Sequence, residues 1–171
     1  GIVQATAPDA EITCDGTELS GHTDMDVYVN GVRLPPDCDL PATATWDDCF
    51  HHNPDMPPGS IISGVGIVLG ENNNKLRNCN VHSYTYGVAL GRDDILLDND
   101  VIHSSNYGIF VEEAKRTTLN NTVVGAGAPN TLPNTVGWFP TLEGFTAINS
   151  KFVNFRDFVI VHGDDANRLI N

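Results

Sequence analysis

The sequence predicts an all-β solenoid, a parallel β-helix, and two observations support this prediction. First, a short phrase recurs: residues 66–70 read GIVLG, residues 87–91 read GVALG, and residues 108–111 read GIFV, each 21 positions after the last. Second, the apolar runs are short, alternate with polar residues and are separated by Gly, Asn, Asp and Ser, so none fits an amphipathic helix. A fixed period of this length indicates a solenoid in which each repeat is one coil. A leucine-rich repeat would need a denser leucine pattern and a helical return segment.

Asparagine recurs at one predicted turn of the repeat. The positions are Asn78, Asn99, Asn121 and, after a longer gap, Asn149. Successive coils of a β-helix lie about 4.8 Å apart, so equivalent residues stack into ladders. Asparagine tolerates left-handed backbone geometry, and stacked amides can hydrogen-bond one another. We therefore predict an asparagine ladder at this turn.

Length and charge restrict the classes of function. The 171 residues suit one domain, residues 1–171, with about five coils. The 22 acidic residues against nine Lys and Arg give a net charge of −13, which argues against nucleic acid and anionic membranes as partners. The same charge is compatible with cation binding. No apolar run reaches the length of a membrane span.

The four cysteines favour an oxidising compartment, and hence a secreted or cell-surface protein. They are Cys14, Cys38, Cys49 and Cys79, and none forms a CxxC pair. Three pairings are possible. Cys38 with Cys49 would close a short loop, whereas Cys14 with Cys79 would join equivalent points of adjacent coils. The alternative is that Cys14 and Cys79 are free thiols buried in a ladder.

Three stretches carry a resemblance to a known family. They are EITCDGTELSG at 11–21, GIVLGENNNKLRNCNVHSYTYGVALG at 66–91 and ILLDNDVIHSSNYGIFV at 95–111. These sequences resemble those of right-handed parallel β-helix proteins of the pectate-lyase-like superfamily, and most of all the NosD-like group. The resemblance covers 10–21 and 60–125 well and 144–165 loosely. It implies a right-handed β-helix, but this scaffold hosts lyases, hydrolases, epimerases, adhesins and spacers, so it specifies function weakly.

Two proline-rich stretches, 22–59 and 126–143, interrupt the period and are predicted as loop insertions. Insertions in solenoids emerge at turns and often form the working face. Each contains one tryptophan, and two tyrosines lie just before the glycine strand. Because flat aromatic faces suit sugar rings, the candidate carbohydrate-binding residues are Trp46, Trp138, Tyr86 and Tyr107. Alternatively, the tyrosines form an aromatic ladder that packs the solenoid.

Acidic residues follow each copy of the glycine strand. They are Glu71, Asp93, Asp94, Glu112, Glu113, Asp164 and Asp165. Carboxylates stacked about 5 Å apart repel unless a cation, a basic neighbour or solvent lies between them. Calcium, which takes several oxygen ligands, is the predicted cofactor at this acidic turn. The alternative is a solvated turn with ion pairs to nearby basic residues such as Arg92 and Arg116.

The sequence favours a structural role over catalysis. The acidic set of polygalacturonases and the Asp-Pro-His-Asp phrase of alginate epimerases are both absent. Open β-helix ends expose unpaired peptide groups, and no amphipathic capping helix is visible in the sequence. We therefore expect an extracellular, non-catalytic subunit that self-assembles end to end into a filament or surface layer. The sequon at Asn120, a predicted glycosylation site, is compatible with this location. The alternatives are a polysaccharide-active enzyme and a carbohydrate-binding adhesin.

Overall fold

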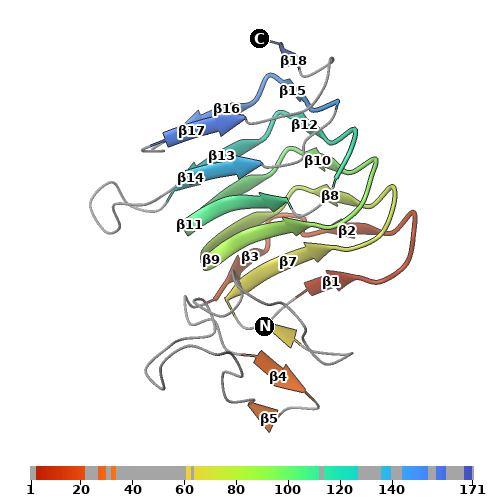
Figure 1. Ribbon diagram of the computed structural model, residues 1–171, viewed down its shortest axis with the longest axis vertical. Coiled ribbons are helices and arrows are strands. Elements are labelled where there is room, and N and C mark those ends of the chain that lie inside the picture. Colours follow the sequence, from red (N-terminus) through yellow and green to blue (C-terminus); the bar gives the residue numbers. More distant parts are fainter. Residues whose placement is uncertain are drawn as a thin grey trace, which may run out of the picture.

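The computed structural model describes residues 3–21, 27–29, 32–33, 61–62, 64–111, 114–126, 136–139, 144–153, 157–160 and 168–170. Within these ranges every regular element is a β-strand, and most strands belong to two stacked parallel sheets (Figure 1). The predicted all-β class is confirmed, and the arrangement is consistent with a β-solenoid. The same ranges contain no helix that is long and apolar enough to cross a membrane.

One sheet has six short strands in the order β18-β15-β12-β10-β8-β2, all parallel. Their bounds are β2 Glu11–Thr13, β8 Lys75–Arg77, β10 Leu96–Asp98, β12 Thr118–Asn120, β15 Thr146–Ile148 and β18 Arg168–Ile170. Each strand pairs with the next over all three residues and without a slip. The middle residues therefore stack into one line, here called the apolar column: Ile12, Leu76, Leu97, Leu119, Ala147 and Leu169.

The other parallel sheet has seven strands. They are β1 Val3–Ala5, β3 Glu18–Ser20, β7 Val65–Leu69, β9 Asn80–Leu90, β11 Val101–Val111, β13 Val123–Ala126 and β16 Lys151–Val153. The long strand β9 has two partners on one side, because its first half pairs with β3 and its second half with β7. Strand β11 pairs with β9 through two shifts of register between His103 and Tyr107. The first half of β9 therefore lies beside β3 and its second half beside β7, and both halves pair with β11.

The core lies between the sheets, because each repeat turns its alternating apolar residues inward. Val88 stacks between Ile67 and Ile109, and Leu90 stacks between Leu69 and Val111. All six side chains are at most 1% exposed. Each copy of the glycine strand therefore supplies two aliphatic side chains to continuous apolar ladders.

The glycine of the recurring phrase is needed because neighbouring backbones lie very close. A Cβ atom on Gly87 would lie 2.7 Å from the carbonyl oxygen of Gly108 and 2.6 Å from Cγ2 of Ile102. A Cβ on Gly66 would meet the carbonyl oxygen of Gly87, also at 2.7 Å. The repeat thus keeps glycine where any side chain would overlap the next strand.

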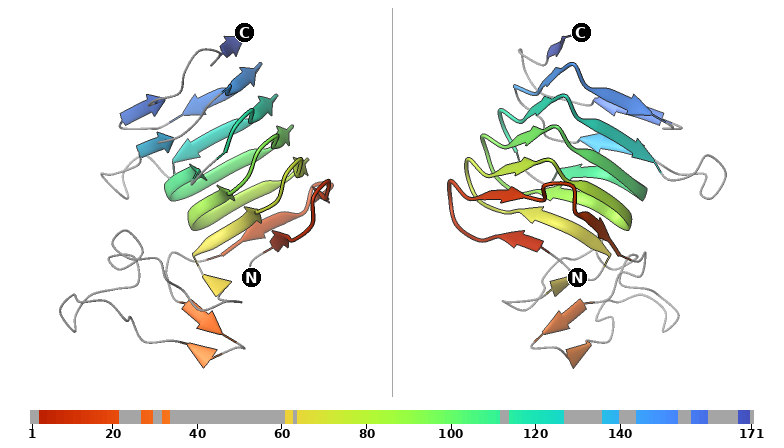
Figure 2. Two further views of the ribbon diagram at one scale, coloured as in Figure 1. Left: turned by 45° about the vertical axis from the view of Figure 1, so that its right-hand side comes forward. Right: turned by 180° about the vertical axis from the view of Figure 1, so that it is seen from behind.

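Strands also occur within the two stretches predicted as loop insertions. Strand β14 (Val136–Phe139) pairs in parallel with β17 (Asp157–Ile160). Strands β4 (Val27–Val29), β5 (Val32–Arg33) and β6 (Ile61–Ile62) form a small antiparallel sheet. This small sheet lies beyond β1, at the N-terminal end of the stack (Figure 2). The interrupted period therefore marks a change in strand arrangement as well as loops.

Candidate functional site

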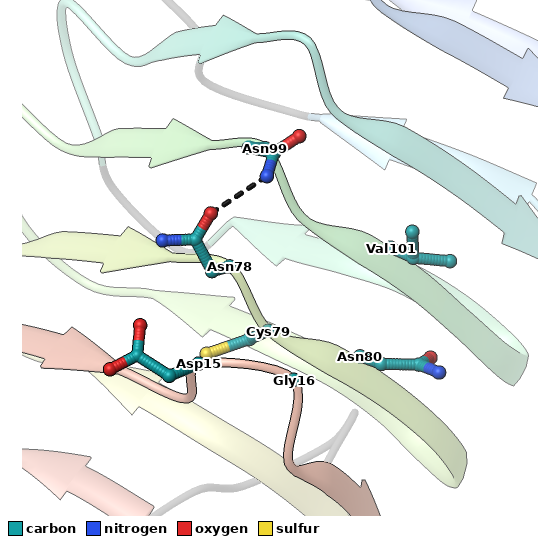
Figure 3. Close-up of a pocket in the computed structure, with 7 residues that line it drawn as sticks. All are labelled: Asp15, Gly16, Asn78, Cys79, Asn80, Asn99 and Val101. Atoms are coloured by element: carbon teal, nitrogen blue, oxygen red, sulfur yellow. Dashed lines mark hydrogen bonds between the residues drawn. The ribbon is translucent and has the colours of Figure 1, made fainter.

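The turn that follows β8, β10, β12 and β15 carries the predicted asparagine ladder. Asn78, Asn99, Asn121 and Asn149 have φ angles of 53°, 58°, 49° and 48°, so all four adopt the left-handed conformation. The side-chain amide of Asn99 donates to Oδ1 of Asn78 at 2.7 Å (Figure 3). The backbone N–H of Asn99 donates to the carbonyl of Asn120 at 2.9 Å. The predicted ladder is confirmed in its backbone geometry, and one amide–amide bond is present.

A disulfide joins Cys14 to Cys79 at the same turn, with their Cα atoms 4.8 Å apart. The bond connects the segment between β2 and β3 to the segment between β8 and β9. The predicted pairing of Cys14 with Cys79 is therefore present in the structure, in place of the buried thiols that were the alternative. The other predicted pair, Cys38 and Cys49, lies outside the described residues.

A shallow hollow of about 500 Å³ lies beside this disulfide. Its walls are Asp15, Gly16, Asn78, Cys79, Asn80, Asn99 and Val101. In Figure 3 the side chains of Asn78 and Asn99 lie together on one side of the turn, whereas Asn80 and Val101 lie on the other. The walls include one carboxylate and no histidine, lysine or arginine, so they do not supply the acid–base pair that glycoside hydrolysis needs.

A buried carboxyl group, which the sequence did not indicate, lies inside the asparagine turn. Asp100 is fully buried. Its Oδ1 atom accepts the backbone N–H of Cys79 at 2.9 Å, and its Oδ2 atom accepts that of Asp98 at 3.0 Å. Burial raises the pKa of Asp100 to about 7, although the two N–H groups act in the opposite direction.

Asp100 belongs to a line of polar residues that directly follow the asparagines. In the next two repeats this position is Thr122 and Ser150. The backbone N–H of Asp100 donates to Oγ1 of Thr122 at 3.4 Å, and that of Thr122 donates to Oγ of Ser150 at 3.1 Å. The signal that could have revealed Asp100 is this position in the repeat, since a left-handed asparagine directs the following side chain into the turn.

At the acidic turn, two of the predicted calcium ligands are neutralised by a basic neighbour. The guanidinium group of Arg116 donates two hydrogen bonds to Asp94, at 2.6 and 2.8 Å, and one to Asp93 at 3.3 Å. These bonds lower the pKa of Asp94. The backbone N–H of Lys115 also donates to Asp93, at 3.0 Å. The local ion pair named as the alternative to calcium is thus present at Asp93 and Asp94.

The other predicted calcium ligands are not brought together by the part of the chain that can be described. Glu71 lies half-buried at the start of the turn after β7. Glu112, Glu113, Asp164 and Asp165 lie outside the described residues. Among the residues that the structure describes, no group of three or more His, Cys, Asp or Glu side chains is placed to hold a metal ion.

The candidate carbohydrate-binding aromatics do not form a strip in the described part of the chain. Tyr86 is 1% exposed and its ring packs against Phe110, with centroids 5.0 Å apart. Its ring is therefore covered, which agrees with the packing alternative. The backbone of Tyr107 pairs with that of Tyr86, and the backbone of Trp138 pairs with Val159. The side chains of Tyr107 and Trp138 lie outside the described part of the structure, and so does the whole of Trp46.

The predicted glycosylation site lies on the outward side of the six-stranded sheet. Asn120 is half-buried at the end of β12, and its amide donates to Oδ1 of Asp98 at 2.9 Å. Thr122, the third residue of the sequon, is fully buried. A glycan on Asn120 would therefore be attached to the nitrogen atom that donates to Asp98.

The two ends of the apolar column form a further candidate site. Leu76, Leu97 and Leu119 in its centre are fully buried. Ile12 at one end is only half-buried, and Leu169 at the other is 62% exposed. Strands β2 and β18 are the two edges of the six-stranded sheet.

Comparisons of the chain with protein-family models, with curated proteins and with solved structures found no match.

Proposed function

We propose that this chain is a right-handed parallel β-helix of about five coils that serves as an extracellular structural subunit. In this proposal it is not a catalyst, and it associates end to end with further copies of itself. The right-handed winding rests on the resemblance to NosD-like proteins and on the strong preference of parallel β connections for that hand. In this proposal residues 1–171 form one domain.

The observation that carries the proposal is the exposed edge at β18. Leu169 is 62% exposed and Ile170 is 45% exposed, whereas the equivalent Leu119 two strands away is fully buried. An edge strand with exposed apolar side chains is a template for pairing with another chain. A head-to-tail contact between identical subunits does not close on itself, so it produces a filament.

Other features are compatible with an extracellular location. The Cys14–Cys79 disulfide supports an oxidising compartment. In the same proposal Asn120 carries a glycan on the outer surface of the sheet, and calcium adds to Arg116 in neutralising the acidic turn.

The test is self-association of the purified protein, measured by light scattering over a range of concentrations and by electron microscopy. We expect filaments or oligomers that grow with concentration. Leu169→Asp should abolish them, because it places a charge in the exposed end of the apolar column. Asn121→Asp is the control that adds the same charge away from both ends, since Asn121 is exposed in the turn between β12 and β13, which each have a neighbouring strand on both sides. A wild-type protein that stays monomeric at every concentration, or an unaffected Leu169→Asp variant, would refute the proposal.

A further inference from the structure

We infer that the partner of the β18 edge is strand β2 of a second copy, bound in parallel with Arg168 opposite Glu11 and Leu169 opposite Ile12. This inference rests on the proposed end-to-end association and specifies which surfaces meet and in which register. It makes the contact heterologous, so that each copy offers β18 to one neighbour and β2 to another.

The register follows from the regular pairing of the six-stranded sheet. The first residues of the six strands lie opposite one another in a single line. In order along the sheet they are Glu11, Lys75, Leu96, Thr118, Thr146 and Arg168. Adding β2 of another copy beside β18 in the same alignment continues this line, and it places Thr13 opposite Ile170. A slip by one residue would place Leu169 opposite Glu11 or Thr13, and would turn the inward face of the incoming copy toward the outer surface, so the in-register pairing is strongly favoured.

Charge complementarity supports the same partner. In the line of outward residues, the contact would place the guanidinium group of Arg168 beside the carboxylate of Glu11. The latter already accepts Arg77 at 3.4 Å, and its side chain remains 45% exposed. Opposite charges directly across two strands stabilise their pairing. A contact between two β18 edges would lack this pair, because it offers arginine on both sides and no carboxylate.

The apolar column supplies the matching surface between the charges. Ile12 is half-buried and Leu169 is largely exposed, and both are the terminal members of the column. Stacking one on the other would give each the covered environment that Leu97 has in the middle. The contact is small, however, and each copy carries a net charge of −13. Association should therefore be reversible and should strengthen with added salt, which screens the repulsion between copies.

A charge-reversal experiment on the full chain tests this pairing. Glu11→Arg and Arg168→Glu should each weaken self-association at least about tenfold, because each opposes like charges at the contact. The double variant should recover it, and an equimolar mixture of the two single variants should co-assemble. Glu71→Arg is the control, since Glu71 follows β7, a strand that has neighbours on both sides and lies at neither end of the stack. Circular dichroism melts check that each variant folds.

Cysteine cross-linking gives a second readout that leaves both Glu11 and Arg168 in place. Thr13→Cys combined with Ile170→Cys should yield covalent oligomers under mild oxidation by diamide, whereas Thr17→Cys, in the exposed turn after β2, combined with Ile170→Cys should yield far fewer. A wild-type protein that does not associate would refute the proposed function. A wild-type protein that associates, but whose association ignores both charge reversal and cross-link position, would overturn this pairing and leave end-to-end association by another surface.

Discussion

The backbone N–H of Cys79 donates a 2.9 Å hydrogen bond to the buried carboxyl group of Asp100, one repeat further along the chain. Because Cys79 is also bonded to Cys14, three successive repeats are linked at one turn, by a disulfide on one side and a buried carboxyl on the other. The stability of this turn therefore depends on the protonation state of one side chain.

The first prediction concerns the pH dependence of stability. The folded-state pKa of Asp100, about 7, lies above its ordinary value of 3.8. The protonated group therefore stabilises the fold fully below a pH of about 3.8, and this contribution is lost progressively as the pH rises from about 3.8 to about 7. Over that window the free energy of unfolding should fall by on the order of 4 kcal/mol, since each pKa unit is worth about 1.4 kcal/mol.

Asp100→Ser should remove this dependence while keeping the turn intact. Serine occupies the equivalent position 150, where its hydroxyl accepts one backbone N–H and donates to the carbonyl of Ile148. Urea unfolding at several pH values between about 3 and 8 measures the effect. Asp15→Asn, on the exposed part of the same turn, is the control that should keep the wild-type slope. Equal slopes in wild type and Asp100→Ser would contradict the assignment.

The second prediction concerns the glycine of the repeat. Gly87→Ala should destabilise the fold by about 1–3 kcal/mol, because its Cβ would overlap the carbonyl oxygen of Gly108. Gly91→Ala is the matched control: the nearest atom to a Cβ there is the Cα of Gly70, at an ordinary 3.8 Å. Chemical denaturation measures the free energy of unfolding of both variants. Equal values would contradict the prediction and would show that the neighbouring strand can shift to make room for the Cβ atom.

The third prediction concerns calcium at the acidic turn. Arg116 places its charge between Asp93 and Asp94, where a cation would otherwise relieve their repulsion. Removing that charge in Arg116→Ala should therefore make the melting temperature respond to calcium more strongly than in wild type. Thermal melts with calcium, with magnesium and with a chelator measure this response. No difference between the variant and wild type would argue that calcium does not bind at these carboxylates.

The sequence indicated the parallel strands and the asparagine ladder because both depend on residues that recur in register. Left-handed geometry at Asn99 is a local preference, so it is visible in one repeat and reinforced by the others. Asp100 was missed because its role depends on burial. In the sequence Asp98-Asn99-Asp100, the second aspartate is expected to be exposed in a turn, and only the direction of its side chain shows that it is buried.

Strand β14 was missed for a different reason. Its Val136-Gly137 pair matches Val65-Gly66, the start of β7, so the sequence contained a partial match to the start of the repeat. The surrounding prolines concealed it, because they are typical of loops. The covered ring of Tyr86 likewise depends on packing between segments far apart in sequence, which no local pattern reports.

The uninterrupted register of the six-stranded sheet has a consequence for how such a chain can change in length. Every junction between neighbouring repeats from β8 to β12 presents the same three-residue pairing on both sides. Duplicating a whole 21-residue unit would add one layer, about 4.8 Å thick, and leave every other contact in place. Gene duplication can therefore lengthen the molecule in whole layers, and the 22-residue step from β10 to β12 shows that one additional residue can be accommodated between strands without loss of register.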